Sequence, residues 1–183
     1  MSGELKGKRV AFLAADGVEQ VELVEPRKAV EAAGAETVLV SLEPGEIQAF
    51  NHLDPGEKIR VDATADSADA SQFDALVLPG GVANPDLLRG DEDAVRFVRA
   101  FFQQEKPVGV ICHGPWTLVE AGVVRGRTLT SWPTLQTDLR NAGAEWVDEE
   151  VHVDGRLVSS RKPDDIPSFN RTVIEVFAGG GGV

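Results

Sequence analysis

The sequence predicts an α/β fold with a mostly parallel sheet, and three observations near its start support that prediction. Residues 9–15 form a continuous apolar run of strand length, which is typical of a strand buried on both faces. Apolar residues then recur at helical spacing over 18–33 and stop at Gly34, although Pro26 is expected to kink or delay this helix. A second apolar run, 37–42, completes a strand–helix–strand unit, whose crossover must be right-handed.

Length and composition predict one domain over residues 1–177 and a flexible glycine-rich tail over 178–183. The 18 lysines and arginines against 30 aspartates and glutamates give a net charge of −12, which argues against nucleic acid and membrane partners. The single cysteine, Cys112, excludes an internal disulfide and cysteine-rich metal motifs. Because we find no secretory signal and no apolar run of roughly 20 residues, we expect a cytoplasmic protein.

Further elements are predicted in the middle of the chain. The stretch 48–61 predicts short antiparallel strands or a loop excursion, and 62–72 predicts a loop or an edge segment. Residues 74–79 predict a third buried strand, which ends in glycines at 80–81 where the backbone can approach another group closely. Residues 91–104 predict a helix with an acidic first turn, as the helix dipole prefers.

A fourth buried strand, 107–111, runs directly into Cys112, and a helix is predicted over 116–121. This order of strand, cysteine, sharp turn and helix is the main local feature of the sequence. The elements expected after it are a short strand, a helix, a hairpin with the turn dipeptide Asp-Gly and a closing helix, at 127–131, 135–142, 151–158 and 164–177.

The position of Cys112 between a buried strand and a helix makes it the strongest functional candidate. Open α/β sheets bind ligands outside the carboxyl ends of their strands. A helix N-terminus supplies partial positive charge and free N–H groups, so we expect the pKa of Cys112 to lie well below about 8.5. The alternative is an inert core cysteine, but an apolar core gives no reason for the adjoining His113 and Gly114.

Six segments in collinear order carry a family resemblance, namely AFLAADGVEQVELVEP (11–26), NHLD (51–54), ALVLPGG (75–81), KPVGVICHGPW (106–116), AGVVRGR (121–127) and AEWVDEEVHVDGRLVSSR (144–161). They look like the PfpI branch of the ThiJ/PfpI superfamily, the superfamily of the Parkinson-associated deglycase. The resemblance extends over residues 8–177. It implies a flavodoxin-like three-layer sandwich with a nucleophile elbow, similar to class I glutamine amidotransferases.

The resemblance also implies roles for individual residues. Cys112 is the nucleophile and is followed directly by His113, as in the PfpI type. A glutamate from the first helix lies beside the sulfur, and the motif assigns that place to Glu22, with Glu19 as the second choice. An ionised carboxylate there would repel a thiolate, so Glu22 must have a raised pKa if it activates Cys112.

Two further implications concern the oxyanion hole and the assembly. The backbone N–H groups of Gly81 and His113 are expected to form the oxyanion hole. In PfpI-type proteins a carboxylate from a neighbouring subunit orients the histidine, and Asp86 is the best positional match here. By itself Asp86 would be a helix cap or a loop charge. The expected assembly is a homodimer or a higher even oligomer.

The remaining candidate side chains are predicted to line the pocket or to have no part in the chemistry. Glu19, His52 and Trp116 are expected to line the pocket; the alternative for His52 is a loop hydrogen bond, and the alternative for Trp116 is core packing. A class I amidotransferase needs His-x-Glu far downstream, and this chain offers only His152-Val-Asp154 in a predicted hairpin. The three histidines show no metal-ligand spacing, so neither a metal nor another cofactor is expected.

The residues and the resemblance predict a stress-protective cysteine hydrolase that acts on carbonyl adducts, as a deglycase or glyoxalase does. Its thiolate would attack an aldehyde or hemithioacetal carbonyl, and water would complete the turnover. An intracellular cysteine peptidase of the PfpI type uses the same groups and stays open. A redox sensor or chaperone, in which Cys112 is oxidised, also stays open. The expected substrate is thus a small carbonyl compound or a peptide.

Overall fold

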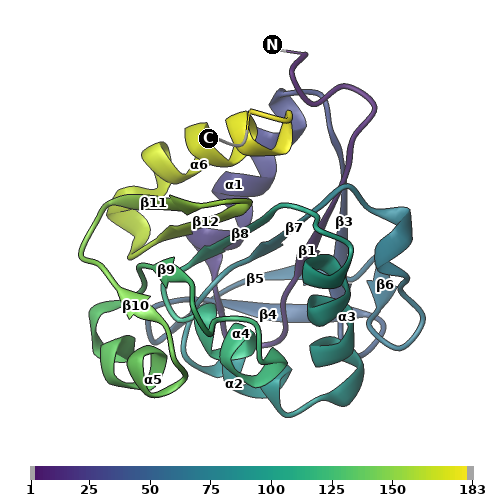
Figure 1. Ribbon diagram of the computed structural model, residues 1–183. Helices are drawn as coiled ribbons and strands as arrows, with labels where there is room; N and C mark the ends of the chain where they lie inside the picture. Colours follow the sequence, from purple (N-terminus) through teal and green to yellow (C-terminus); the bar gives the residue numbers. More distant parts are fainter. Residues whose placement is uncertain (1–2, 181–183) are drawn as a thin grey trace.

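The computed structural model describes residues 3–180 and shows one seven-stranded sheet between two layers of helices (Figure 1). All neighbouring strands in this sheet are parallel except β11, which pairs antiparallel with β12 at one edge. In spatial order the strands are β11 (Val151–Asp154), β12 (Leu157–Ser160), β8 (Val108–Ile111), β7 (Ala75–Leu78), β1 (Arg9–Leu13), β3 (Glu36–Ser41) and β6 (Ala63–Thr64). The predicted flavodoxin-like α/β sandwich is confirmed.

Alternate side chains of the central strands feed two separate hydrophobic cores, as expected for strands with a side-chain period of two. One face packs against α1 (Gln20–Ala32) and α6 (Ile166–Phe177), with Phe12 and Val77 pointing that way. The other face packs against α3 (Glu92–Gln103) and α4 (Pro115–Ala121). Figure 1 shows these two pairs of helices on opposite sides of the sheet.

The strand order reverses between β1 and β7, which places a ligand crevice at a defined point. From β1 the chain moves to β3 on one side, and later returns to β7 and β8 on the other side. The carboxyl ends of β1, β7 and β8 therefore meet at one edge of the sheet. The segments that follow these three strands carry all the candidate site residues except His52.

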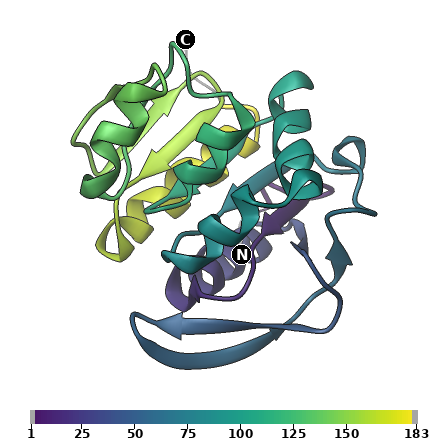
Figure 2. The same cartoon turned by 90° about the horizontal axis from the view of Figure 1, so that it is seen from below.

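A second sheet of three strands lies beside this edge. It consists of β2 (Val18–Glu19), β4 (Glu46–Asn51) and β5 (Asp54–Arg60). The β4–β5 pair is the antiparallel hairpin that the stretch 48–61 suggested, and Figure 2 shows it as a two-stranded ribbon at the margin of the domain. Because residues 18–19 pair with β4, α1 begins at Gln20, two residues later than predicted.

Other elements differ from the sequence prediction in small ways. Helix α1 continues through Pro26, which costs one backbone hydrogen bond but does not end the helix. A short helix, α2 (Ala83–Arg89), follows the glycines after β7 and was not predicted. The remaining elements are β9 (Thr128–Leu129), α5 (Gln136–Asn141), β10 (Glu145–Trp146) and three 3₁₀ turns at Ala70–Gln72, Pro133–Leu135 and Pro163–Asp165.

The predicted flexible tail begins inside a helix cap. Gly180 donates its N–H to the Glu175 carbonyl and Gly179, at φ 102°, donates to the Val176 carbonyl, which is the Schellman arrangement that closes α6. Residues 178–180 therefore belong to the helix end, and 181–183 lie outside the described residues.

The close packing of α6 on the sheet predicts a strong effect at Gly109 in β8. A Cβ atom there would lie 2.9 Å from Cγ2 of Val173 and 3.1 Å from Cζ of Phe169. We expect Gly109→Ala to lower the free energy of unfolding by about 1–3 kcal/mol through overpacking, as measured by urea denaturation. Gly3→Ala, which has open space around the new methyl group, is the matched control. Equal effects of the two substitutions would contradict this account of the interface.

Candidate active site

Cys112 lies at a strained turn between β8 and α4. Its φ of 63° is in the left-handed region, which an L-residue other than glycine seldom adopts. The turn is held on both sides, because the Cys112 N–H donates to the Ser160 carbonyl at 3.1 Å and its carbonyl accepts from the Trp132 N–H at 2.9 Å. The side chain is buried, with 6% of the residue exposed. The predicted elbow geometry is thus present.

The glycines after β7 allow the backbone to approach this turn. A Cβ atom on Gly80 would lie 2.7 Å from Cβ of Cys112 and 2.6 Å from Oε1 of Glu22, so no larger residue fits. Gly81 has a φ of 81°, and a Cβ there would lie 2.4 Å from the Gly17 carbonyl oxygen. These two positions bring a second backbone segment against the thiol.

Glu22 is fully buried at the same point. Its Oε1 accepts a hydrogen bond from the Gly80 N–H at 3.0 Å, whereas Oε2 has no hydrogen-bond partner among residues 3–180. Burial raises the pKa of Glu22 to about 8; the nearby thiol of Cys112 partly offsets the rise, and the charge of Glu19 adds to it. Glu22 therefore holds a proton at neutral pH, as its sequence-based role requires.

The thiol differs from the sequence-based expectation. Burial raises the pKa of Cys112, and the charge of an ionised Glu22 raises it further. The backbone N–H groups of Gly81 and His113 lower the pKa of the thiol, but by less than burial raises it. The expected low pKa of Cys112 is thus wrong, because the first turn of α4 does not compensate for the loss of solvent around the sulfur.

His113 is placed to exchange a proton with the sulfur. Its Nδ1 lies 3.1 Å from Sγ of Cys112. Burial lowers the pKa of His113, so the imidazole is neutral at pH 7 and can accept the thiol proton. The ring stacks on Trp132 with 5.8 Å between centroids and meets the edge of Trp116 at 5.2 Å. Two indoles therefore fix its orientation.

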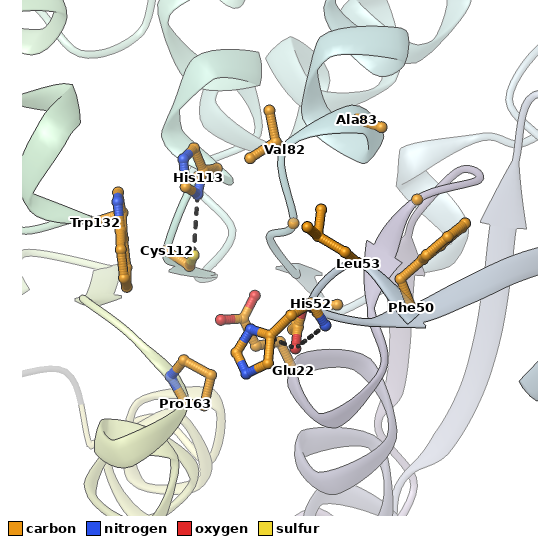
Figure 3. Close-up of a pocket in the computed structure, with 13 residues that line it drawn as sticks. Glu22, Phe50, His52, Leu53, Val82, Ala83, Cys112, His113, Trp132 and Pro163 are labelled. Carbon is orange, nitrogen blue, oxygen red and sulfur yellow. Dashed lines mark hydrogen bonds and ion pairs between the residues drawn. The ribbon is translucent and has the colours of Figure 1, made fainter. Parts of the chain in front are cut away.

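The sulfur faces a cavity of about 500 Å³. Figure 3 shows Cys112 and His113 with Trp132 and Pro163 on one side and Phe50 and Leu53 on the other. The cavity is lined by thirteen residues: Gly17, Glu19, Glu22, Phe50, His52, Leu53, Gly81, Val82, Ala83, Cys112, His113, Trp132 and Pro163.

Glu19 and His52 lie in this cavity as expected from the sequence. The backbone nitrogen of His52 is 3.2 Å from both Glu19 carboxyl oxygens. The ring Nδ1 of His52 lies 3.7 Å from Oε1 of Glu19. Trp116 does not line the cavity. Its indole N–H donates to Asp138, and its ring packs edge-on against His113. The indole at the cavity wall is Trp132, which the sequence analysis did not select.

Asp86 does not reach His113 within its own chain. It lies on α2, its side chain is 60% exposed, and it pairs with Arg89 at 3.1 Å. The Arg89 guanidinium in turn stacks over Trp116. His152, which the sequence analysis rejected as a catalytic residue, pairs with Glu149.

Asn84 is a positioning residue that the sequence analysis missed. It is fully buried in α2, where its Oδ1 accepts from the Ala15 N–H at 2.7 Å. Its Nδ2 donates to the carbonyls of Pro79 and Gly80 at 3.1 and 2.9 Å. The amide thus joins the end of β1 to the glycine segment. An asparagine just after Gly-Gly-Val-Ala was the available signal, since asparagine is seldom fully buried without partners.

Metal clusters and membrane-spanning helices are both absent from the part of the chain that the structure describes. No group of three or more His, Cys, Asp or Glu side chains among residues 3–180 could hold a metal ion. No helix in that range is long and apolar enough to cross a membrane.

The fold and the geometry around Cys112 are those of one protein family, and comparison with known proteins identifies that family. The model of the DJ-1/PfpI family matches residues 8–176, and the chain belongs to this family. Deglycase PH1704 of Pyrococcus horikoshii is 45% identical over 92% of this chain and 98% of its own length.

Two further similarities are informative. YraA of Bacillus subtilis, which carries a provisional name as a cysteine protease, is 43% identical over 90% of this chain and 95% of its own length. The crystal structure of Drosophila melanogaster DJ-1beta superposes with a TM-score of 0.85 at 26% identity, and the match covers 98% of this chain and 92% of that one.

The coupling of Glu22 to Cys112 predicts a change in thiol reactivity. Because an ionised Glu22 raises the pKa of the thiol, Glu22→Gln should move the iodoacetamide labelling curve to lower pH by on the order of one unit. The variant keeps an oxygen for the Gly80 N–H, so the fold should remain. Glu19→Gln, three residues away, should shift the curve by less. Identical curves for the two variants would refute the assignment of Glu22 as the coupled group.

Proposed function

We propose that this protein is a cysteine-dependent hydrolase of carbonyl adducts, of the deglycase or glyoxalase type, with Cys112 as its nucleophile. The observation that supports this most directly is the convergence of four groups on one sulfur. These are the neutral imidazole of His113, the protonated carboxyl of Glu22 and the N–H groups of Gly81 and His113. A relative that is named a deglycase adds to this support.

The raised pKa of the thiol makes His113 the base for the first step. As the sulfur attacks an aldehyde carbon, the thiol proton passes to Nδ1 of His113, which lies 3.1 Å from the sulfur. The carbonyl oxygen then takes up a proton, and a neutral hemithioacetal results. The nearby N–H donors of Gly81 and His113 would stabilise the transient oxyanion.

With a 2-oxoaldehyde the remaining steps need only proton transfers and one water. By way of an enediol, the proton on the former aldehyde carbon moves to the adjacent carbonyl carbon and the hydroxyl proton moves to the oxygen of that carbonyl. This gives a thioester of a 2-hydroxy acid. Water hydrolyses the thioester and restores the thiol. When the aldehyde arrives as an adduct of an amine, the free amine leaves, so the sum is adduct plus water giving amine plus 2-hydroxy acid.

The decisive assay compares substrates across variants of the nucleophile. Wild type, Cys112→Ala and Cys112→Ser should be tested on methylglyoxal, a glycated peptide and casein. We expect lactate release from methylglyoxal or the glycated peptide to fall by at least about 100-fold in both variants, because serine is a far weaker nucleophile. Activity that persists in Cys112→Ala would remove the thiol from the mechanism.

A peptidase is the second candidate, because YraA carries a provisional cysteine-protease name. It would use the same sulfur and the same N–H donors. The casein arm of the assay separates the two functions: thiol-dependent casein cleavage without lactate release would favour the peptidase.

We also propose that Asp86 of a second copy orients His113. Asp86 is exposed on α2 and does not contact His113 of its own chain. Val82 and Leu87, on the same short segment, are exposed apolar side chains at 58% and 46%, and an interface between copies would cover them.

This arrangement predicts a separation of catalysis from assembly. Asp86→Asn should lower turnover by roughly 10-fold or more while the mass from light scattering stays that of the wild-type dimer or higher even oligomer. Asp93→Asn, which removes a similarly ion-paired charge on α3, serves as the control. A fully active, concentration-independent monomer would rule out the shared site.

A further inference from the structure

The cavity beside Cys112 has an unbalanced set of charged groups. No lysine or arginine is present among its thirteen lining residues. The ionisable groups that face it are two carboxyls, Glu19 and Glu22, two imidazoles, His52 and His113, and the thiol itself. A substrate that carries a carboxylate would therefore find no cationic side chain in this cavity.

The charge of this set at neutral pH comes mainly from one residue. Glu22 keeps its proton because its pKa is raised to about 8, and His113 is neutral because burial lowers its pKa. The negative charge of Glu19 is felt inside the cavity, since it contributes to the raised pKa of Glu22. Glu19 is thus the side chain that sets the electrostatic potential next to the thiol.

Glu19 is also held in place. Both carboxyl oxygens face the His52 N–H at 3.2 Å, and the Glu19 N–H donates to the Gly80 carbonyl at 3.4 Å. Only 13% of its side chain is exposed, so water screens its charge less than that of an open surface carboxylate. Apolar side chains complete the rim: Phe50, Leu53 and Val82.

We propose that Glu19 makes the active site select its substrates by charge. Neutral and cationic carbonyl compounds, including adducts with a nearby guanidinium or ammonium group, reach Cys112. Carbonyl compounds that carry a carboxylate, such as 4,5-dioxopentanoate, are repelled by a fixed negative charge that no lysine or arginine of the cavity balances. This inference rests on the proposed function for its substrate class, but the charge selection itself can be measured at the thiol without turnover.

Because Cys112 is the single cysteine, its modification rate can be measured without interference from other thiols. The probes are methanethiosulfonates with a trimethylammonium-ethyl, a methyl or a sulfonatoethyl group, which are cationic, neutral and anionic. In each case the sulfur of Cys112 attacks the sulfenyl sulfur, a mixed disulfide forms and methanesulfinate leaves. The ratio of the cationic to the anionic rate, each divided by the neutral rate, reports the local potential.

A high salt concentration at pH 7.5 and a matched control variant isolate the effect of Glu19. At 0.5 M salt the screening length is about 4 Å, so the overall charge of −12 has little influence while a partly buried charge still acts. Glu175→Gln is the matched control, since it removes one exposed carboxylate from α6, outside the cavity.

We expect wild type to react faster with the cationic than with the anionic probe, and Glu19→Gln to lower that ratio by roughly fivefold. The glutamine keeps an oxygen for the His52 N–H, and circular dichroism with thermal melting would verify the fold. Glu175→Gln should change the ratio by less than about twofold. A ratio that stays the same in Glu19→Gln, or that falls equally in Glu175→Gln, overturns the proposal.

A second measurement separates this proposal from the proposed function. Turnover of methylglyoxal and of 4,5-dioxopentanoate, a 2-oxoaldehyde that carries a carboxylate, is compared in wild type and Glu19→Gln, and the preference for the neutral aldehyde should fall with the charge. If neither aldehyde is turned over while the probes show the expected ratios, the hydrolase proposal fails and the charge selection stands. If both aldehydes are turned over equally well in wild type, selection by Glu19 is refuted and the hydrolase remains.

Discussion

The left-handed backbone of Cys112 is the constraint on which the site depends. Holding such a residue at a φ of 63° costs on the order of 1–3 kcal/mol, so the surrounding structure must fix it. Strand β12 does so through the Ser160 carbonyl, and the segment at Trp132 does so through its N–H. The result is a buried side chain that leaves the strand end sharply and lines the cavity.

This turn brings three chain segments into contact, and each contact limits the others. Gly80 can have no side chain because Cys112 and Glu22 occupy that space. Asn84 holds the glycine segment against the end of β1 through its buried amide. The N–H of Gly80 then fixes Oε1 of Glu22, and the carboxyl ends up beside the sulfur. Losing any one of these contacts would therefore weaken the positioning of the other groups around the sulfur.

Burial has opposite consequences for the reactivity of the site through Glu22 and through Cys112. It keeps Glu22 protonated at neutral pH, which removes a charge that would oppose a thiolate. It also raises the pKa of the thiol, so in the proposed mechanism the sulfur depends on proton transfer to His113. The hydrolase that we propose would therefore work through coupled proton transfers and not through a preformed thiolate.

The sequence by itself determined the α/β class, the strand–cysteine–helix order and the choice of Cys112 and Glu22 as candidate site residues, because these follow from apolar runs, turn residues and a collinear family resemblance. Residues 18–19 looked helical from their spacing, yet they pair with β4, since a strand partner far along the chain is invisible to local periodicity. The pKa of the thiol, the place of Trp132 instead of Trp116 and the role of Asn84 were decided only by the tertiary structure. Each depends on solvent exclusion or on contacts between segments that are distant in the sequence, and no local pattern encodes them.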